Sequence, residues 1–92
     1  MPVLVMKFGG TSVASIDRIT RAAKRVAREV ALGYDVIAIV SAMSGKTNEL
    51  AGWVNDISPL HDAREYDAVV SAGENVTAGL MALVLQEMEI PA

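Results

Sequence analysis

The sequence predicts an α/β fold that is built on parallel β-strands, and three observations lead to this prediction. Two short apolar runs, at residues 2–8 and at Asp35–Val40, are rich in valine and isoleucine, as β-strands are. The segment between the runs has apolar residues at helical spacing. A strand, a helix and a second strand form a βαβ unit, in which the strands are parallel and the crossover is almost always right-handed.

The first strand and the first helix have clear ends in the sequence. The run "PVLVMKF" stops at Gly9-Gly10, which predicts a tight turn after the strand. Ser15 is a suitable N-cap for the helix, and Gly33 is a suitable stop after it. One face of the helix carries the apolar residues Ile16, Ile19, Ala23, Val26 and Val30. We therefore expect a helix from residue 15 to 32, followed by the strand Asp35–Val40.

The second half of the chain predicts helices with interruptions. Residues 46–54 are suited to a short helix, which the turn-forming segment "NDISPLHD" at residues 55–62 would end. A further helix is expected at residues 63–70, before a break at Ser71-Ala72-Gly73. From Glu74 to Met88 the chain is apolar on nearly every side in its middle, which is typical of a helix buried between other elements.

Composition limits the class of protein. The 92 residues are 52% hydrophobic and 21% charged, which is typical of one soluble globular domain. The net charge of −3 argues against nucleic acid as a partner. With no cysteine and a single histidine, the chain offers no thiolate, and we expect no metal site built from its side chains. We find no signal peptide and no apolar run near the roughly 20 residues of a membrane-spanning helix, so we expect a cytoplasmic protein without a membrane partner.

Both strands are apolar at consecutive positions rather than at alternate ones. Strands of this kind are covered on both faces of a parallel sheet, and two strands alone cannot supply such a sheet. We therefore expect the chain to be the N-terminal part of a larger α/β domain, whose other parts lie outside residues 1–92. The alternative is a free-standing small domain, whose exposed strand edges and faces would favour assembly with a partner.

Two loops are candidates for binding a phosphate group. Gly45-Lys46-Thr47 matches the end of a P-loop, but a P-loop needs glycine at the position that Val40 occupies. The stronger candidate is Gly9-Gly10, because it lies at the carboxyl end of the first strand and opens toward a helix N-terminus. Lys7 would place an ammonium group beside phosphate oxygens. The same residues are equally typical of a plain turn that follows a solvated lysine.

The other polar residues near the strand ends have structural interpretations as well. Glu74 is expected at the start of the buried helix, where the helix dipole stabilises a carboxylate whatever its function. Four polar residues after the second strand would suit a small ligand, but capping of the next helix is the favoured interpretation; they are Ser41, Ser44, Thr47 and Asn48. Four arginines form a stripe on the first helix, which we interpret as a solvated surface; they are Arg18, Arg21, Arg25 and Arg28.

Three stretches taken together resemble the N-terminal part of the aspartate kinases, which belong to the amino acid kinase family. They are "KFGGTSV" at residues 7–13, "VSAMSGKTNEL" at 40–50 and "SAGENVTAGLMALVLQE" at 71–87. Their order and spacing match, and the resemblance covers nearly the whole chain. The chain differs from the usual family pattern at Asn75, where glutamine is usual, and around Ser44 and Lys46. The resemblance implies an incomplete form of the three-layer, carbamate kinase-like fold of this family, beginning with its parallel βαβ unit.

The resemblance also implies a reaction. ATP, with Mg²⁺ held mainly by its phosphates, would phosphorylate the side-chain carboxylate of L-aspartate to 4-phospho-L-aspartate, the first step towards lysine, threonine, methionine and isoleucine. Lys7 would be catalytic, because it would balance the charge of the transferring phosphoryl group. The residues implied to bind the phosphates are Lys7, Gly9, Gly10, Thr11 and Ser12. The residues implied to bind aspartate are Ser41, Thr47 and Glu74, of which Glu74 would accept the α-ammonium group.

The family further implies parts that have no counterpart in residues 1–92. These are the remainder of the kinase domain, with the adenine pocket, and the regulatory ACT domains. We therefore expect the segment alone to be inactive, and the full-length enzyme to be a homo-oligomer. Two other hypotheses remain open. One is another member of the amino acid kinase family with a different acceptor, and the other is a non-catalytic truncated chain that acts only by assembling with a partner.

Overall fold

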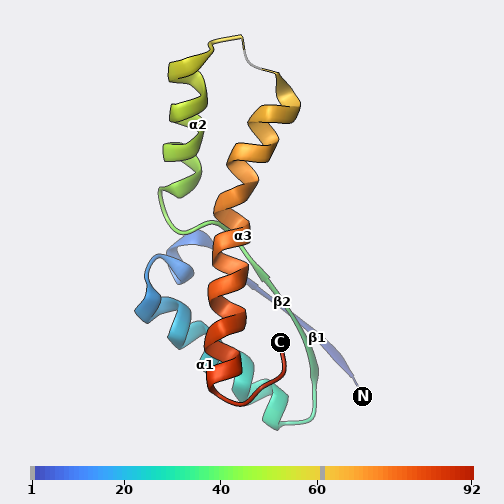
Figure 1. The fold of residues 1–92 in the computed structure, drawn as a ribbon. Helices are drawn as coiled ribbons and strands as arrows, with labels where there is room; N and C mark the ends of the chain where they lie inside the picture. Colours follow the sequence, from blue (N-terminus) through green and yellow to red (C-terminus); the bar gives the residue numbers. More distant parts are fainter. Residues whose placement is uncertain (1, 61) are drawn as a thin grey trace.

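The structure, a computed structural model, describes residues 2–60 and 62–92. Two strands, one short 3-10 turn and three α-helices follow one another along this part of the chain (Figure 1). Their order and bounds are β1 (Val3–Phe8), η1 (Gly10–Val13), α1 (Ile16–Ala31), β2 (Asp35–Val40), α2 (Lys46–Ile57) and α3 (Ala63–Glu87).

The two strands form a parallel pair, which confirms the predicted βαβ unit. The register runs from Val3 opposite Asp35 to Phe8 opposite Val40, so both strands end at the same level. One backbone hydrogen bond beyond the register extends the pairing at the carboxyl end, where the Ser41 N–H donates to the Phe8 carbonyl oxygen at 3.2 Å. The loops that follow β1 and β2 therefore leave the sheet side by side.

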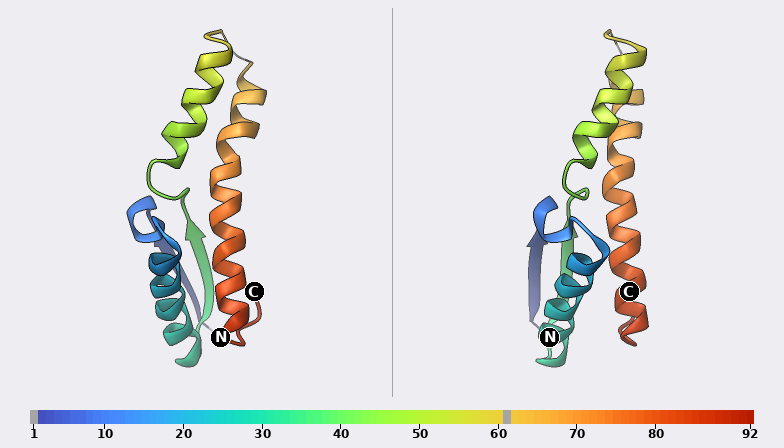
Figure 2. Two further views of the ribbon diagram at one scale, coloured as in Figure 1. Left: turned by 60° about the vertical axis from the view of Figure 1, so that its left-hand side comes forward. Right: turned by 90° about the vertical axis from the view of Figure 1, so that its left-hand side faces the viewer.

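One face of this sheet holds the core. Helices α1 and α3 both lie over that face (Figures 1 and 2). The core residues, all at most 7% exposed, are Phe8, Val13, Ile19, Ala22, Ala23, Val26, Met81 and Leu85. The other face is open in the described residues, since its apolar side chains are 46–61% exposed; they are Val3, Val5, Ile37 and Ile39. The predicted cover on both faces is therefore present on one face of the described chain.

Helix α1 begins and ends where the sequence predicts. The Ser15 side chain accepts a hydrogen bond from the Arg18 backbone N–H at 3.2 Å, which satisfies one of the free amides of the first turn. Gly33 follows the helix with a φ of 99°, a left-handed conformation that other residues adopt at a cost.

The second half contains longer helices than the sequence predicts. α2 continues to Ile57, and α3 is one continuous helix through Ser71-Ala72-Gly73, so the predicted break is wrong. Glycine lowers helix propensity by about 1 kcal/mol, but at Gly73 the helix packs directly on the loop after β2, and tertiary contact outweighs that cost. The buried residues of α3 recur every fourth position, at Gly73, Thr77, Met81 and Leu85.

Burial of α3 is one-sided, which corrects the expectation of a helix enclosed by other elements. Val76 and Leu83 are 55% and 58% exposed, whereas Met81 is 4% exposed. The hydroxyl of the fully buried Thr77 donates to the Gly73 carbonyl oxygen at 3.1 Å, so this polar group is satisfied within the helix.

α3 also has the length and composition of a membrane-spanning helix, which corrects the expectation that no segment comes near that length. It is 25 residues long and has a mean hydropathy of 1.6 in its most apolar window. A core helix of a soluble protein has the same two properties, and α3 does contribute Met81 and Leu85 to the core.

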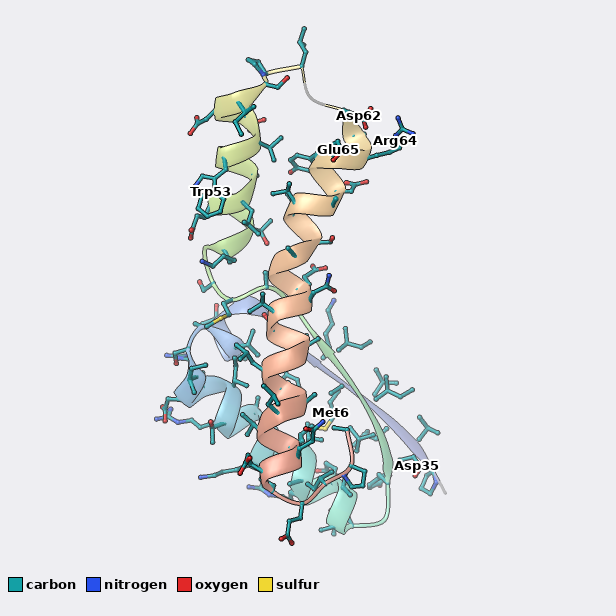
Figure 3. All side chains as sticks on the ribbon, viewed as in Figure 1. Met6, Asp35, Trp53, Asp62, Arg64 and Glu65 are labelled. Carbon is teal, nitrogen blue, oxygen red and sulfur yellow. The ribbon has the colours of Figure 1, made fainter. Side chains whose placement is uncertain are left out.

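The upper parts of α2 and α3 form a helical hairpin that extends beyond the sheet (Figure 2). The molecule is accordingly elongated, with extents of 49 × 25 × 18 Å. Trp53 points away from α3 on the outer side of α2 (Figure 3), and it is 55% exposed. The hairpin therefore has few core contacts, whereas the lower part of α3 is anchored over the sheet.

We predict that Ile19→Ala lowers the free energy of unfolding by about 2–5 kcal/mol, because Ile19 is fully buried and the substitution leaves a cavity. Urea unfolding followed by circular dichroism measures the change. Ile16→Ala on the same helix is the matched control, because Ile16 is 56% exposed and should cost less than about 1 kcal/mol. Equal losses for the two variants would contradict the described core.

We also predict a pH dependence at the start of α3, where Asp62 and Arg64 lie together (Figure 3). The Arg64 side chain and the backbone N–H groups of Arg64 and Glu65 hold the pKa of Asp62 below its ordinary value. Because the pKa is lowered in the folded state, this interaction stabilises the fold fully at pH values above the ordinary carboxyl pKa of about 4. The stabilisation is lost as the pH falls through the lowered pKa.

The variant Asp62→Asn tests this, because asparagine keeps a side-chain oxygen for the Arg64 N–H, which lies 2.7 Å from the Asp62 Oδ1 in the native protein. Thermal unfolding between neutral and acidic pH should show a smaller fall in Tm for Asp62→Asn than for the native protein. Identical pH profiles for the two proteins would refute the role of Asp62.

Candidate functional site

The candidate site lies at the carboxyl edge of the sheet, where ligands bind in open α/β sheets. Three stretches meet there: the loop after β1, the loop after β2, and the middle of α3 (Figure 2). The hydrogen bond from the Ser41 N–H to the Phe8 carbonyl oxygen ties the first two stretches together.

Lys7 lies one residue before the end of β1, opposite Ile39 of β2. Its side chain is exposed on the open face of the sheet, away from α1 and α3. Within residues 2–60 and 62–92 the ammonium group makes no ion pair. A cation in this position, at the start of the glycine loop, is available to an anionic ligand.

The glycine loop after β1 is a single 3-10 turn. Gly9 is extended, and the Ser12 N–H donates to the Gly9 carbonyl oxygen at 3.0 Å to close the turn. Val13, at the end of the turn, is fully buried and anchors the loop to the core. The first N–H groups of such a turn have no acceptor within the turn, so those of Gly10 and Thr11 are suited to an anion.

The contribution of the α1 N-terminus to anion binding at this loop stays a prediction, because a 3-10 turn separates the glycine pair from the start of the helix. α1 begins only at Ile16, beyond the 3-10 turn, and Ser15 already caps it. The link between the loop and the helix is the side chain of Arg18, one of the four arginines of the stripe on α1. The Arg18 Nη1 donates to the Thr11 carbonyl oxygen at 3.2 Å and so holds the loop against α1. The arginine and Thr11 are seven residues apart, and the helical period of α1 does not predict a contact with a residue outside the helix.

The loop after β2 leads directly into α2, and the capping interpretation of its polar residues is wrong. Gly45 is the N-cap, with a φ of 81°, and no side chain caps the helix. Ser41 is half-buried, whereas Thr47 is exposed in the first turn of α2. Neither hydroxyl makes a hydrogen bond in the part of the chain that the structure describes. Both therefore remain available to a ligand.

Lys46 is occupied within α2. Its Nζ lies 3.1 Å from the Glu49 Oε2, one turn further along the helix. The Glu49 carboxylate offsets the positive charge of Lys46, which differs from the usual family pattern in residues 40–50. The net charge around Thr47 is therefore less positive than Lys46 alone suggests.

Glu74 lies in the interior of α3, and the expected position at a helix start is wrong. The helix begins at Ala63, so the positive end of the helix dipole lies at the tip of the hairpin, far along the helix from Glu74. The carboxylate is exposed and makes no ion pair with any residue in 2–60 or 62–92. A ligand cation is then a more specific partner for it than the helix dipole.

Gly73, the residue before Glu74, brings α3 against the loop after β2. A Cβ atom at this position would lie 3.0 Å from the Ala42 Cβ and 3.3 Å from the Leu50 Cδ1. Gly10 makes a similar approach from the other side, since a Cβ there would lie 2.9 Å from the Ala42 carbonyl oxygen. Ala42 therefore touches both the glycine loop and α3, a role that its small apolar side chain did not reveal in the sequence.

The predicted site residues thus share one edge of the sheet, but their side chains do not touch each other. Backbone contacts join the glycine loop to the loop after β2, and the side chains of Ala42 and Leu50 join that loop and α2 to α3. Lys7, Thr47 and Glu74 make no mutual hydrogen bond or ion pair in the described residues.

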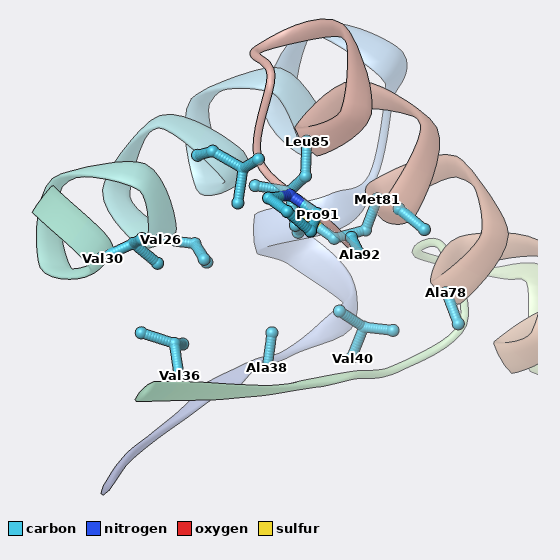
Figure 4. A pocket seen from close by; sticks show the side chains of 12 residues that line it. Val26, Val30, Val36, Ala38, Val40, Ala78, Met81, Leu85, Pro91 and Ala92 are labelled. Atoms are coloured by element: carbon cyan, nitrogen blue, oxygen red, sulfur yellow. The ribbon is translucent and has the colours of Figure 1, made fainter. Parts of the chain in front are cut away.

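A cavity of about 250 Å³ lies elsewhere, between β2, α1 and the end of α3 (Figure 4). Val26, Val36, Met81 and Leu85 are among its lining residues, and no lining residue has a titratable side chain. An apolar hollow of this kind offers packing surface and no chemistry, so we do not assign it a reaction.

The comparisons with known proteins agree with the geometry. The amino acid kinase family matches residues 2–92. The aspartokinase of Rickettsia felis is 48% identical over 95 residues, which cover 100% of this chain and 24% of the relative. The aspartokinase of Pseudomonas aeruginosa is 45% identical over 92 residues, which cover 100% of this chain and 22% of the relative.

The crystal structure of aspartate kinase from Synechocystis matches with a TM-score of 0.94 and 42% identity, over 98% of this chain and 15% of that chain. The chain spans about a quarter of the length of the two curated relatives. Its βαβ unit is the start of the fold that the Synechocystis structure has, and the resemblance of the three stretches is confirmed. The chain belongs to the amino acid kinase family.

Proposed function

We propose that the chain is the N-terminal part of an aspartate kinase, which transfers the γ-phosphoryl group of ATP to the side-chain carboxylate of L-aspartate. An oxygen of that carboxylate attacks the γ-phosphorus. The bond from the γ-phosphorus to the oxygen that bridges it to the β-phosphorus breaks, and ADP leaves. The products are ADP and 4-phospho-L-aspartate, the precursor from which lysine, threonine, methionine and isoleucine are made.

One observation carries the proposal. The stretches at residues 7–13, 40–50 and 71–87 meet around one loop, in a chain that is 48% and 45% identical to two proteins named aspartokinase. A glycine loop beside an unpaired lysine suits a phosphate group, and an unpaired carboxylate suits an ammonium group. ATP and an amino acid have these two chemistries.

The glycine loop would bind the phosphates. The amides of Gly9 and Gly10 would donate to phosphate oxygens, and Thr11 and Ser12 would extend the same loop with their exposed hydroxyls. Lys7 would balance the negative charge on the γ-phosphoryl group as it moves. Phosphoryl transfer depends mainly on positioning and on electrostatic stabilisation, so a loop held by Arg18 and Val13 is a suitable support.

The loop after β2 and α3 would bind aspartate. Ser41 and Thr47 have hydroxyls without a partner in the described chain, and these would donate to carboxylate oxygens. The uncapped amides at the start of α2 favour a negative group at the same place. Glu74 would accept a hydrogen bond from the α-ammonium group, so one residue both selects an amino acid and orients it for in-line attack.

Mg²⁺ would enter with ATP and neutralise phosphate charge. The donor set of the chain fits an ion that the phosphates carry, because residues 2–60 and 62–92 contain no group of three His, Cys, Asp or Glu side chains placed to hold a metal. Side chains of this segment would then act on the phosphates rather than on the ion.

The remainder of the enzyme would complete the site. We propose that further parts of the kinase domain cover the open face of the sheet, supply the adenine pocket, and carry the ACT domains, so residues 1–92 alone do not turn over. The full-length protein would be a cytoplasmic homo-oligomer without a membrane or nucleic-acid partner. The exposed apolar side chains of Val5 and Ile37 support such cover, because large exposed apolar faces are unfavourable in water.

We predict that Glu74→Gln raises the KM for aspartate by roughly 10- to 150-fold in the full-length enzyme, with the KM for ATP nearly unchanged. The size follows from a lost hydrogen bond between charged groups, about 1.5–3 kcal/mol. Steady-state assays of ADP release measure both constants.

Glu65→Gln is the matched control, because Glu65 is also exposed on α3 but lies near its start, at the tip of the hairpin (Figure 3). It should change neither constant. An enzyme that uses a different acceptor would show no aspartate-dependent ADP release at all, and a chain that acts only by assembly would form a stable complex without turnover.

We predict that Lys7→Met lowers kcat by about 10²–10³-fold, the usual effect of removing one group that stabilises a transition state. Rapid-quench or steady-state kinetics at saturating substrates gives kcat. Lys24→Met is the control, since Lys24 is exposed on α1 and makes no ion pair in the part of the chain that the structure describes. Comparable activity of the two variants would remove Lys7 from the reaction.

A further inference from the structure

We propose that Ala42 is a positioning residue for this reaction, because it sets the spacing between the phosphate-binding loop and the helix that carries Glu74. The inference rests on the proposed function, and it assigns to Ala42 no contact with a substrate. Ala42 is 5% exposed and lies in the loop between β2 and α2.

The contact with the phosphate loop is between backbone atoms. A Cβ at Gly10 would lie 2.9 Å from the Ala42 carbonyl oxygen, and 3.6 Å from the backbone N of Ser44. Gly10 does not have a positive φ, so its conformation is open to other residues. The need for glycine there comes from the close approach of the two loops, which no rotation of a side chain could relieve.

The contact with α3 is between side chain and helix. A Cβ at Gly73 would lie 3.0 Å from the Ala42 Cβ, and 3.3 Å from the Lys46 Cγ. The methyl group of Ala42 is thus in contact with the helix surface directly beside Glu74. A substituent added on either side of this contact must move the helix or the loop.

The loop that carries Ala42 is fixed at both ends and cannot yield easily. On one side the Ser41 N–H donates to the Phe8 carbonyl oxygen at 3.2 Å, and on the other the Lys46 N–H donates to the Met43 carbonyl oxygen at 2.9 Å. α3 in turn is anchored in the core through Met81 and Leu85. Ala42 therefore transmits the position of one substrate-binding element to the other.

The expected consequence is kinetic. In-line transfer needs the reacting atoms about 3–3.5 Å apart, and a displacement of 1 Å can cost about 10²-fold in rate. A change in this spacing should lower kcat. The affinity for ATP and the stability of the fold should change far less.

The test uses the full-length enzyme and moves one methyl group across the contact. Gly73→Ala adds a methyl group to the helix at Ala42, and the double variant Ala42→Gly/Gly73→Ala removes the one it meets. Gly79→Ala is the matched control, because Gly79 lies on the same helix and a Cβ there has nothing within 4 Å. Both single variants replace glycine by alanine in a helix interior, so each gains about the same helix propensity.

We expect Gly73→Ala to lower kcat at least about tenfold, with a Tm no lower than the native value and an unchanged Kd for ATP, and the double variant to recover at least about threefold of that loss. Gly79→Ala should stay near the native kcat. The proposal is overturned if Gly73→Ala resembles Gly79→Ala, or if the double variant recovers less than that.

If the double variant does not fold, Ala42→Ser replaces it, since serine adds one atom at the same contact. A lower kcat at native Tm and native Kd for ATP supports the proposal, and a native kcat overturns it. Failure of the native full-length enzyme to release ADP with aspartate would instead reject the proposed function, so the two failures are distinguishable.

Discussion

The parallel pairing of β1 with β2 is the interaction on which the rest of the structure depends. Its register ends at Phe8 opposite Val40, so the chain leaves both strands at the same edge. An antiparallel pair would place the two loops at opposite ends of the sheet. The crossover helix α1 makes the parallel arrangement possible, and its buried face, with Ile19 fully inside, holds it in place. The candidate site is thus a consequence of strand direction.

Close packing at two glycines, which have no side chains of their own, completes the candidate site. Gly10 and Gly73 lie in segments far apart in the sequence, and each leaves room for a contact with Ala42 that a Cβ atom would prevent. The continuity of α3 matters for the same reason. One rigid helix joins Leu85 in the core to Gly73 at the site, so Glu74 is held by the packing of the sheet rather than by a loop. Groups on rigid elements keep their relative positions better than groups on loops do.

The local structure around the candidate site could be inferred from the order of residue types, because strands and turns depend on short stretches. The glycine pair after β1, Lys7 before it and the strand bounds Asp35–Val40 all follow from local patterns. The predictions are wrong where contacts between segments far apart in the sequence determine the local structure. Local propensity disfavours a helix at Ser71-Ala72-Gly73 and so predicts a break there. The helix is nevertheless continuous, and Gly73 packs on Ala42. For the same reason, the prediction that Glu74 lies at a helix start is wrong. Arg18 is exposed, as expected of a solvated stripe, but helical periodicity does not show that its side chain donates to the Thr11 carbonyl oxygen.

The sequence by itself determined the α/β class and the parallel βαβ unit, since hydrophobic period, caps and turns act over a few residues. The tertiary structure alone decided that α3 is unbroken, that α2 begins without a side-chain cap, and that Ala42 lies against both Gly10 and Gly73. The physical reason is range. Local backbone preferences amount to about 1 kcal/mol per residue, and contacts between segments far apart in the chain can outweigh them.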